Sequence, residues 1–277
     1  MDAKELFRRY EGGPMRETKS KEKRNQVVDL AGIDSLRTLL WSRTVIERAG
    51  FAPSAILDRY NFQLSRIEFP LYAKAQRLPS VETLVDVEQA HPIGRNAAKE
   101  RPFAGTRRIF ELGPDGLPLW KVLEGATSTC DSVLDGWLTH RSHKPTGMDF
   151  PQKLWHLIKT LTPQDELEHI ERLSSLPVGD RFTYETSMLA ALGTSVGMDT
   201  YDIERLEVEP DLETVVAVLA AWQLSHERRT MRSEMDYLLI GVVSAFHQVI
   251  SLIYAELSIW LHDRAKELIR ARIPLES

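Results

Sequence analysis

The sequence predicts an all-α protein, in which a small helical N-terminal module precedes a C-terminal helical bundle. Apolar residues recur at spacings of three and four along most of the chain, which is the period of an α-helix. The stretch Tyr237–Ala255 carries no formal charge. A helix that is apolar on nearly every face has to be enclosed by other helices, by a second subunit or by lipid. The only extended structure that the pattern allows is one short strand or hairpin near residues 107–120.

The apolar stretch lies inside a longer helical pattern over residues 228–272, and a membrane span is the alternative interpretation. Its length just reaches the roughly 18 to 20 residues that a span requires. However, Ser244, His247 and Gln248 lie near its centre, where polar groups are costly in hydrocarbon. The pattern also continues amphipathically beyond both ends. We therefore expect a long buried helix of a bundle and no membrane partner.

Composition narrows the class of protein. A chain of 277 residues with 43% hydrophobic and 27% charged residues folds into a globular protein with one large or two modest cores. The net charge of −5 argues against non-specific coating of nucleic acid, although a local basic patch is allowed. Cys130 is the only cysteine, which excludes an intramolecular disulfide. Together with a charged N-terminal sequence that lacks the apolar core of a secretory signal, this indicates a cytoplasmic protein.

Three parts are expected along the chain: a basic arm over 1–30, the helical module over 31–145 and the bundle over 146–277. The arm carries four clustered cations, which form either a solvated face or a phosphate-contacting arm: Lys19, Lys21, Lys23 and Arg24. Pro145, Gly147 and Pro151 mark the boundary between the module and the bundle.

Local signals place the helices of the module. Gly50 ends a first helix with an apolar face, and Pro53 suits the first turn of the next. Ser80 can cap a helix through Glu88, with Val81, Leu84, Val85 and Val87 on its inner face. Residues 107–112 can form a strand followed by a turn, and residues 117–123 a short helix closed by glycine. Helices in the bundle are predicted over 150–161, 163–176 and 212–225.

The boundary Arg77-Leu-Pro-Ser-Val-Glu-Thr-Leu, after a helix that ends at Ala49-Gly50, resembles the closing half of a Cro/C1-repressor-type (XRE-like) helix-turn-helix domain. The resemblance covers residues 35–90. It implies that Gln63–Lys74 occupies the position of the DNA-reading helix, and the implied contacts are Gln63, Ser65, Arg66, Lys74 and Arg77. Pro70 inside that helix and Ala75 at the turn depart from the family's pattern. A degenerate domain that serves packing or protein contact is therefore the alternative.

No motif assigns a reaction. His140 and His143 flank Arg141 at helical spacing, but no third ligand follows at a recognised distance, so no metal site is assigned. Gly193-Thr-Ser-Val-Gly197 matches the letters of the nucleophile motif Gly-x-Ser-x-Gly, but no predicted strand precedes it, as that motif requires. The phosphate-binding loop Gly-x-x-x-x-Gly-Lys-Ser/Thr is missing from the sequence. We therefore assign no catalytic residue and no cofactor.

These observations favour a non-enzymatic regulatory or assembly protein that contacts DNA or a protein partner through its N-terminal module. The terminal helix would support a homo-oligomer or a larger assembly. One alternative is an enzyme or toxin-like effector with a site built from His140, Arg141 and His143. Another is a bundle that binds a small molecule or lipid beside Phe246, Ile250 and Tyr254.

Overall fold

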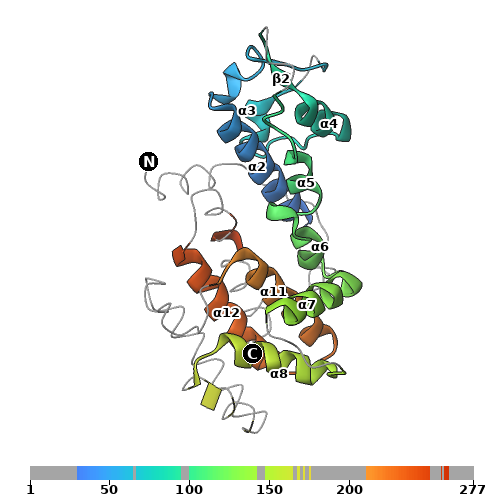
Figure 1. Ribbon diagram of the computed structural model, residues 1–277, viewed down its shortest axis with the longest axis vertical. Coiled ribbons are helices and arrows are strands. Elements are labelled where there is room, and N and C mark those ends of the chain that lie inside the picture. Colours follow the sequence, from blue (N-terminus) through green and yellow to red (C-terminus); the bar gives the residue numbers. More distant parts are fainter. Residues whose placement is uncertain are drawn as a thin grey trace, which may run out of the picture.

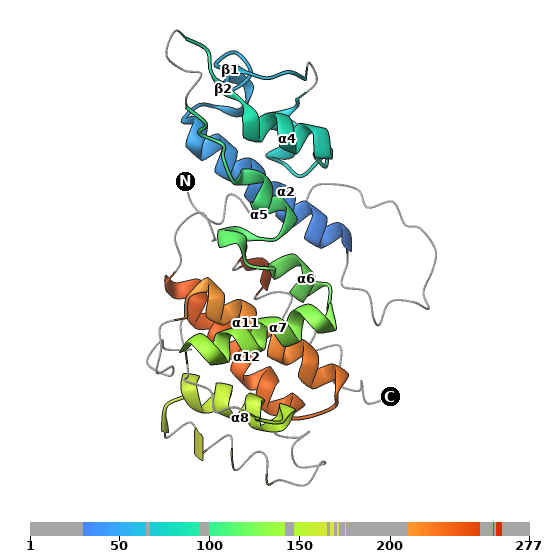
Figure 2. The ribbon, with the colours of Figure 1, turned by 45° about the vertical axis from the view of Figure 1, so that its right-hand side comes forward.

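The computed structural model describes residues 30–64, 67–94, 100–141, 147–164 and 210–249, together with positions 167, 168, 171, 175, 257 and 259–261. Helices make up almost all of the regular structure in these residues, which confirms the predicted all-α class. Figures 1 and 2 show an elongated molecule with the N-terminal helices at one end and the C-terminal helices at the other.

The N-terminal end is built around one long helix and several short ones. These elements are α2 (Leu30–Ala49), the 3₁₀ turn η1 (Pro53–Ala55), α3 (Phe69–Tyr72), α4 (Val81–Gln89) and α5 (Thr106–Glu111). Two predicted end signals are confirmed. Gly50 follows α2 with a φ of +68°, a conformation that glycine adopts without steric cost. Ser80 caps α4, because its hydroxyl accepts a hydrogen bond of 3.2 Å from the backbone N–H of Thr83.

Extended structure occurs in a different place from the one predicted. The strands β1 (Tyr60–Asn61) and β2 (His91–Pro92) pair antiparallel, with Tyr60 opposite Pro92. The strand or hairpin that the sequence allowed near 107–120 is wrong, because this region holds α5, the 3₁₀ turn η3 (Pro114–Gly116) and the start of α6 (Leu119–Leu123). Arg107 and Glu111 lie one helical turn apart and form a 2.6 Å ion pair that suits a helix.

The N-terminal end has its own small core, which is rich in aromatic rings. Trp41 of α2 is fully buried, with ring centroids of Phe69, Tyr72 and Phe110 at 6.3, 5.5 and 6.4 Å. The buried members of this small core are Trp41, Val45, Ala49, Ile56, Tyr60, Ile67, Phe69, Tyr72, Leu84, Val87, Ala90 and Phe103.

The C-terminal end is a bundle arranged around α11 (Leu212–Glu227). Every residue of α11 from Thr214 to Trp222 is buried, and the helix packs most extensively against α7 (Thr127–Arg141) and α12 (Arg232–Val249). Figure 2 shows α11, α7 and α12 lying together above α8 (Phe150–Leu161). Asp149 and Gln152 form a capping box at the start of α8.

The described part of the predicted terminal helix is enclosed by protein, as expected. Leu238, Leu239, Val242, Val243 and Phe246 of α12 are all buried within the single chain. The helix begins later than the predicted residue 228, because a turn over 228–231 separates it from α11. In this turn Arg229 and Met231 have φ values of +55° and +51°. Within the described ranges, no helix combines the length and the apolarity needed to cross a bilayer.

The larger core extends across the boundary that we predicted at 145/146. Leu119 and Trp120 of α6 and Leu134 of α7 pack with Leu154 of α8 and with α11. The first turns of α2 join the same core through Ile33, Leu36 and Leu40. Helix α2 therefore contributes its N-terminal half to the larger core and its C-terminal half to the small core. The division into 31–145 and 146–277 stays a prediction.

Candidate interaction surface

A hollow of about 380 Å³ opens on the N-terminal end, between α3 and the start of α4. It lies where the segment after β1 meets the connection that leads into α4. Its lining combines apolar, hydroxyl and charged side chains: Leu64, Tyr72, Arg77, Leu78, Ser80, Glu82 and Thr83. The cap of α4 fixes one wall, because the hydroxyls of Ser80 and Thr83 lie 3.1 Å apart at the first turn of that helix.

Asp86 holds the part of the lining that Leu64 forms. Its buried carboxylate accepts a 2.9 Å hydrogen bond from the backbone N–H of Gln63 and a 2.8 Å bond from that of Leu64. Both bonds are charge-assisted, and such bonds are about twice as strong as neutral ones. One side chain on α4 therefore fixes the backbone that presents Leu64 to the hollow.

Replacing Asp86 by alanine is expected to lower the free energy of unfolding by about 2 kcal/mol, because two backbone N–H groups lose a charged acceptor. Urea unfolding measures the loss, and amide exchange at Gln63 and Leu64 should become faster. Glu88→Ala is the matched control on the same helix, since Glu88 accepts one exposed bond, from the backbone N–H of Gly105. Equal losses for the two variants would contradict this role of Asp86.

Large apolar side chains are exposed at this end of the molecule. Among the residues for which exposure is described, all the exposed large hydrophobic side chains lie between residues 51 and 93: Phe51, Leu57, Leu64, Leu78, Val81 and Ile93. Val81 is 61% exposed, so its predicted place on the inner face of α4 is wrong, whereas Leu84 and Val87 are buried as expected. Val81 starts the helix and projects beyond the small core.

Five of these six exposed residues fall into two groups. Leu64 and Leu78 line the hollow, and Val81 lies between Ser80 and Glu82, which line it too. In the second group, the guanidinium carbon of Arg59 lies 5.2 Å from the ring centroid of Phe51. The backbone N–H of Ile93 donates a 2.9 Å hydrogen bond to the carbonyl oxygen of Arg59, which places Ile93 beside this pair.

The predicted DNA contacts are only partly within the described residues. Gln63 and Lys74 are exposed, and Arg77 lines the hollow and forms an ion pair with Glu68. The other six predicted contacts lie outside the described residues: Lys19, Lys21, Lys23, Arg24, Ser65 and Arg66.

The segment expected to act as a DNA-reading helix is not one continuous helix. Residues 62–64 and 67–68 are non-helical, and α3 supplies a single turn from Phe69 to Tyr72. The helical interpretation of Gln63–Lys74 is therefore wrong. Pro70 sits in the first turn of α3, where a proline is tolerated, and Ala75 has a φ of +49° at the turn where the family carries glycine.

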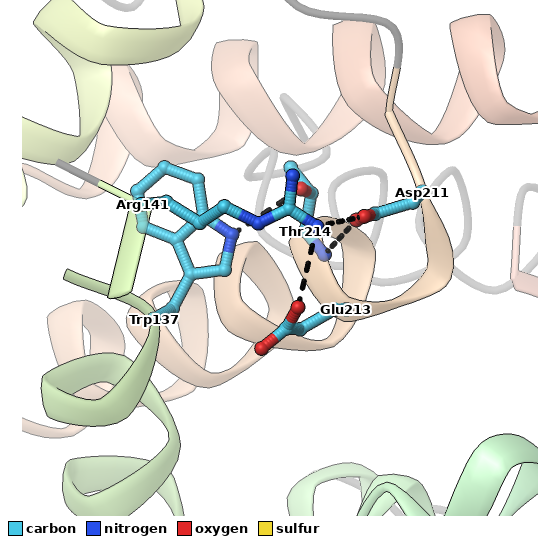
Figure 3. A network of polar contacts seen from close by, with 5 residues as sticks. All are labelled: Trp137, Arg141, Asp211, Glu213 and Thr214. Atoms are coloured by element: carbon cyan, nitrogen blue, oxygen red, sulfur yellow. Dashed lines mark hydrogen bonds and ion pairs between the residues drawn. The ribbon is translucent and has the colours of Figure 1, made fainter. Parts of the chain in front are cut away.

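Of the residues named for the enzyme alternative, Arg141 has structural partners. Figure 3 shows Arg141 at the end of α7 reaching the start of α11, where it pairs with Asp211 and lies 3.3 Å from Glu213. Asp211 accepts a 2.8 Å bond from the backbone N–H of Thr214, and the indole of Trp137 donates a 3.2 Å bond to the Thr214 hydroxyl. His140 is exposed, and His143 lies outside the described residues. The network fastens α7 to α11.

Asp211 gives this network a pH dependence. Burial alone would raise the pKa of the carboxyl, but hydrogen bonds from Thr214 and the charge of Arg141 outweigh burial and hold the pKa below its ordinary value of 3.8. A lowered pKa in the folded state means that the carboxylate contributes stability above pH 3.8, and that this contribution is lost as pH falls through the folded value.

Asp211→Ala is therefore expected to lower the free energy of unfolding by about 1 kcal/mol at pH 7, the usual value of an N-cap. Urea unfolding at pH 7 and near pH 3 should show the difference from the native chain shrinking in acid. Asp211→Asn is the control, because asparagine keeps the cap and loses only an exposed ion pair, worth about 0–1 kcal/mol. A constant difference at both pH values would contradict this role.

A second polar cluster links α11 to α12. The carboxylate of Asp236 accepts a 2.6 Å hydrogen bond from the indole N–H of Trp222 and lies 3.0 Å from Nε2 of His226.

Cys130 is buried, and burial raises the pKa of its thiol to about 11, far from the range of a nucleophilic cysteine. Among the described residues, no group of three or more His, Cys, Asp or Glu side chains is arranged to hold a metal ion.

The third alternative placed a ligand beside Phe246, Ile250 and Tyr254. Phe246 is buried in the larger core, and the other two residues lie outside the described part of the chain.

Sequence reasoning missed Leu64, Tyr72, Leu78 and Asp86 as members of a site. Only one local signal pointed to this site, namely the apolar residue Leu78 placed directly before the Pro-Ser cap of α4.

Comparison with known proteins finds no matching protein-family model, no similar curated protein and no similar solved structure. The role of the hollow therefore has to follow from its own residues.

Proposed function

We propose that this chain is a non-enzymatic regulatory or assembly protein that contacts a protein partner through its N-terminal helical module. The observation that carries the proposal is the gathering of exposed large apolar side chains between residues 51 and 93. Exposed apolar residues that concentrate in one region of a folded protein are typical of interaction sites. The C-terminal bundle serves as the rigid support for this module.

Charge favours protein over DNA as the partner. Residues 51–93 contain four basic and five acidic side chains, so the segment offers no excess of positive charge to phosphate groups. Arg77 is already paired with Glu68, and Arg59 lies against Phe51. Apolar contacts with a polar rim are the usual basis of protein–protein recognition.

Self-association and a cytoplasmic location belong to the same proposal. The described apolar residues of α12 are covered within one chain, so oligomerisation would use other surfaces. Light scattering at micromolar concentration tests self-association. A monomer would remove oligomerisation from the proposal and leave the partner contact.

The proposed cytoplasmic location rests on the single cysteine, which is buried and suits a reducing compartment.

Comparative co-purification from the native host tests the partner contact. The tagged full-length chain is compared with a triple variant, Phe51→Ser, Val81→Ser and Ile93→Ser, and with a control variant that changes three exposed bundle residues, Thr139→Ser, His140→Ser and Gln164→Ser. We expect at least one protein to be recovered with the native chain and the control and reduced at least fivefold with the triple variant.

Two results would overturn the proposal. One is identical recovery of every protein with all three chains. The other is a difference that disappears after nuclease treatment, combined with binding of duplex DNA that weakens between low and high salt, which would assign the module to nucleic acid.

A further inference from the structure

Tyr72 gives the hollow a polar group that has no partner among the described residues. The residue is only 2% exposed, and its ring packs edge-on against Trp41 and Phe69 in the small core. No described residue hydrogen-bonds to its hydroxyl, and the hydroxyl is not among the fully enclosed unpaired polar atoms of the described chain. Because Tyr72 lines the hollow and its hydroxyl is not fully enclosed, we infer that the hydroxyl faces that space. Buried tyrosine hydroxyls usually find a partner, so this one is available to an occupant.

Two of the residues that line the hollow together with Tyr72 are aliphatic, and the backbone around both is fixed. Leu78 is 49% exposed although it lies next to the buried Pro79, and Leu64 faces the same space. The backbone on both sides is held, by Asp86 at Leu64 and by the Ser80 cap after Leu78. A site with fixed walls loses little conformational freedom on binding. The volume is at the lower end of the range of binding pockets, about 300–1,000 Å³, which suits one or two side chains.

Among the charges that the structure describes at the rim, the unpaired one is negative. Glu82 is fully exposed, and a hydrogen bond from the Ser80 hydroxyl lowers the pKa of its carboxyl, so it is ionised at neutral pH. No described cation pairs with it, whereas Arg77 on the same rim is neutralised by Glu68. An occupant that carries a positive charge beside its apolar group is complementary to this rim, and a phosphate is not.

We propose that the hollow binds a segment of a partner protein in which a large apolar side chain lies within two residues of a lysine or arginine. The apolar side chain packs between Leu64 and Leu78, an oxygen of the segment accepts a hydrogen bond from the Tyr72 hydroxyl, and the cation pairs with Glu82. Val81 extends the apolar contact beyond the hollow, which favours a peptide segment over an isolated small molecule. This assignment rests on the proposed function.

Peptide selection tests the assignment while the partner is still unidentified. A phage-displayed random 12-residue library is selected on the full-length chain, with counter-selection on Leu78→Asp. We expect an enriched pattern that joins a large apolar residue to Lys or Arg. A synthetic peptide of that pattern, measured by fluorescence anisotropy, should lose at least tenfold in affinity on Leu78→Asp. Leu78 is half exposed, so this variant should keep the native circular dichroism spectrum and melting temperature.

Two further variants separate binding from folding. Tyr72→Phe keeps the ring and removes an unpaired hydroxyl, so it should weaken the peptide about threefold to tenfold and leave the melting temperature unchanged. Glu82→Lys should weaken the basic peptide by a similar factor and strengthen a peptide in which Lys or Arg is replaced by Glu. Glu124→Lys, an exposed position in the bundle, is the control and should change neither affinity.

A failure of this binding site and a failure of the proposed function give different experimental results. Peptides that bind Leu78→Asp as well as the native chain would overturn this site and leave the proposed protein contact to the co-purification experiment. If the selected peptides lacked a basic residue and their affinity did not change with Glu82→Lys, the assignment of a positively charged occupant would be overturned. Failure to select any peptide would overturn the inference as a whole. Displacement of the peptide by duplex DNA at low salt would assign the hollow to nucleic acid and overturn both proposals.

Discussion

Replacing Val218 by aspartate is expected to lower the free energy of unfolding by more than about 4 kcal/mol, because an unpaired carboxylate would enter a fully enclosed position. Val218 lies in the middle of the buried run of α11 and is itself fully buried. Folded domains of ordinary stability retain only about 5–15 kcal/mol, so most of the bundle's stability would be lost. Urea unfolding followed by circular dichroism measures the change.

The matched control is Ser132→Asp on α7, which adds the same group at an exposed position. A surface substitution of this kind should stay within about 0.5 kcal/mol of the native chain. If Val218→Asp were tolerated as well as Ser132→Asp, α11 would not be the enclosed centre of the bundle.

Truncation of Trp41 to alanine is expected to cost about 3–5 kcal/mol, the range for removing a buried aromatic side chain. Trp41 is fully buried and contacts the rings of Phe69, Tyr72 and Phe110. Its removal would leave a cavity beneath α3, directly under one wall of the hollow. Chemical unfolding monitored by circular dichroism gives the loss, and thermal melting gives an independent check.

Trp41→Phe is the informative companion to that variant. The indole nitrogen of Trp41 is buried and has no hydrogen-bond partner among the described residues. Its loss should therefore carry no hydrogen-bond penalty, and the phenyl variant should cost less than about 2 kcal/mol, mainly from reduced packing. A loss for Trp41→Phe as large as the loss for Trp41→Ala would contradict this role of the indole nitrogen.

The sequence predicted those features that depend on neighbouring residues. Gly50 after α2, Ser80 before α4 and the amphipathic helix α8 could be predicted because capping and helical periodicity act over one or two turns. Enclosure of the apolar stretch after Tyr237 followed from hydrophobicity alone, and Leu238, Leu239, Val242, Val243 and Phe246 within it are buried.

Features that depend on tertiary packing were not predictable. Residues 107–112 alternate too briefly to separate strand from helix, and packing against α2 decides for a helix. Helix α11 has a shorter apolar run than the stretch after Tyr237. It nevertheless proves to be the enclosed centre of the described bundle, because α6, α7 and α12 pack against it. The hollow joins residues from four segments between Leu64 and Thr83, and a sequence pattern does not show how they meet.

The central claim, that the N-terminal module contacts a protein at the hollow, is tested most directly by photocrosslinking. A photoreactive benzoylphenylalanine replaces Val81 in the full-length chain expressed in its native host, and a second chain carries it at the exposed position 132 of α7. We expect a crosslinked protein at position 81 that survives nuclease treatment, disappears when Leu78→Asp is added and does not form at position 132. No adduct at position 81, or an adduct that nuclease removes, would contradict the claim.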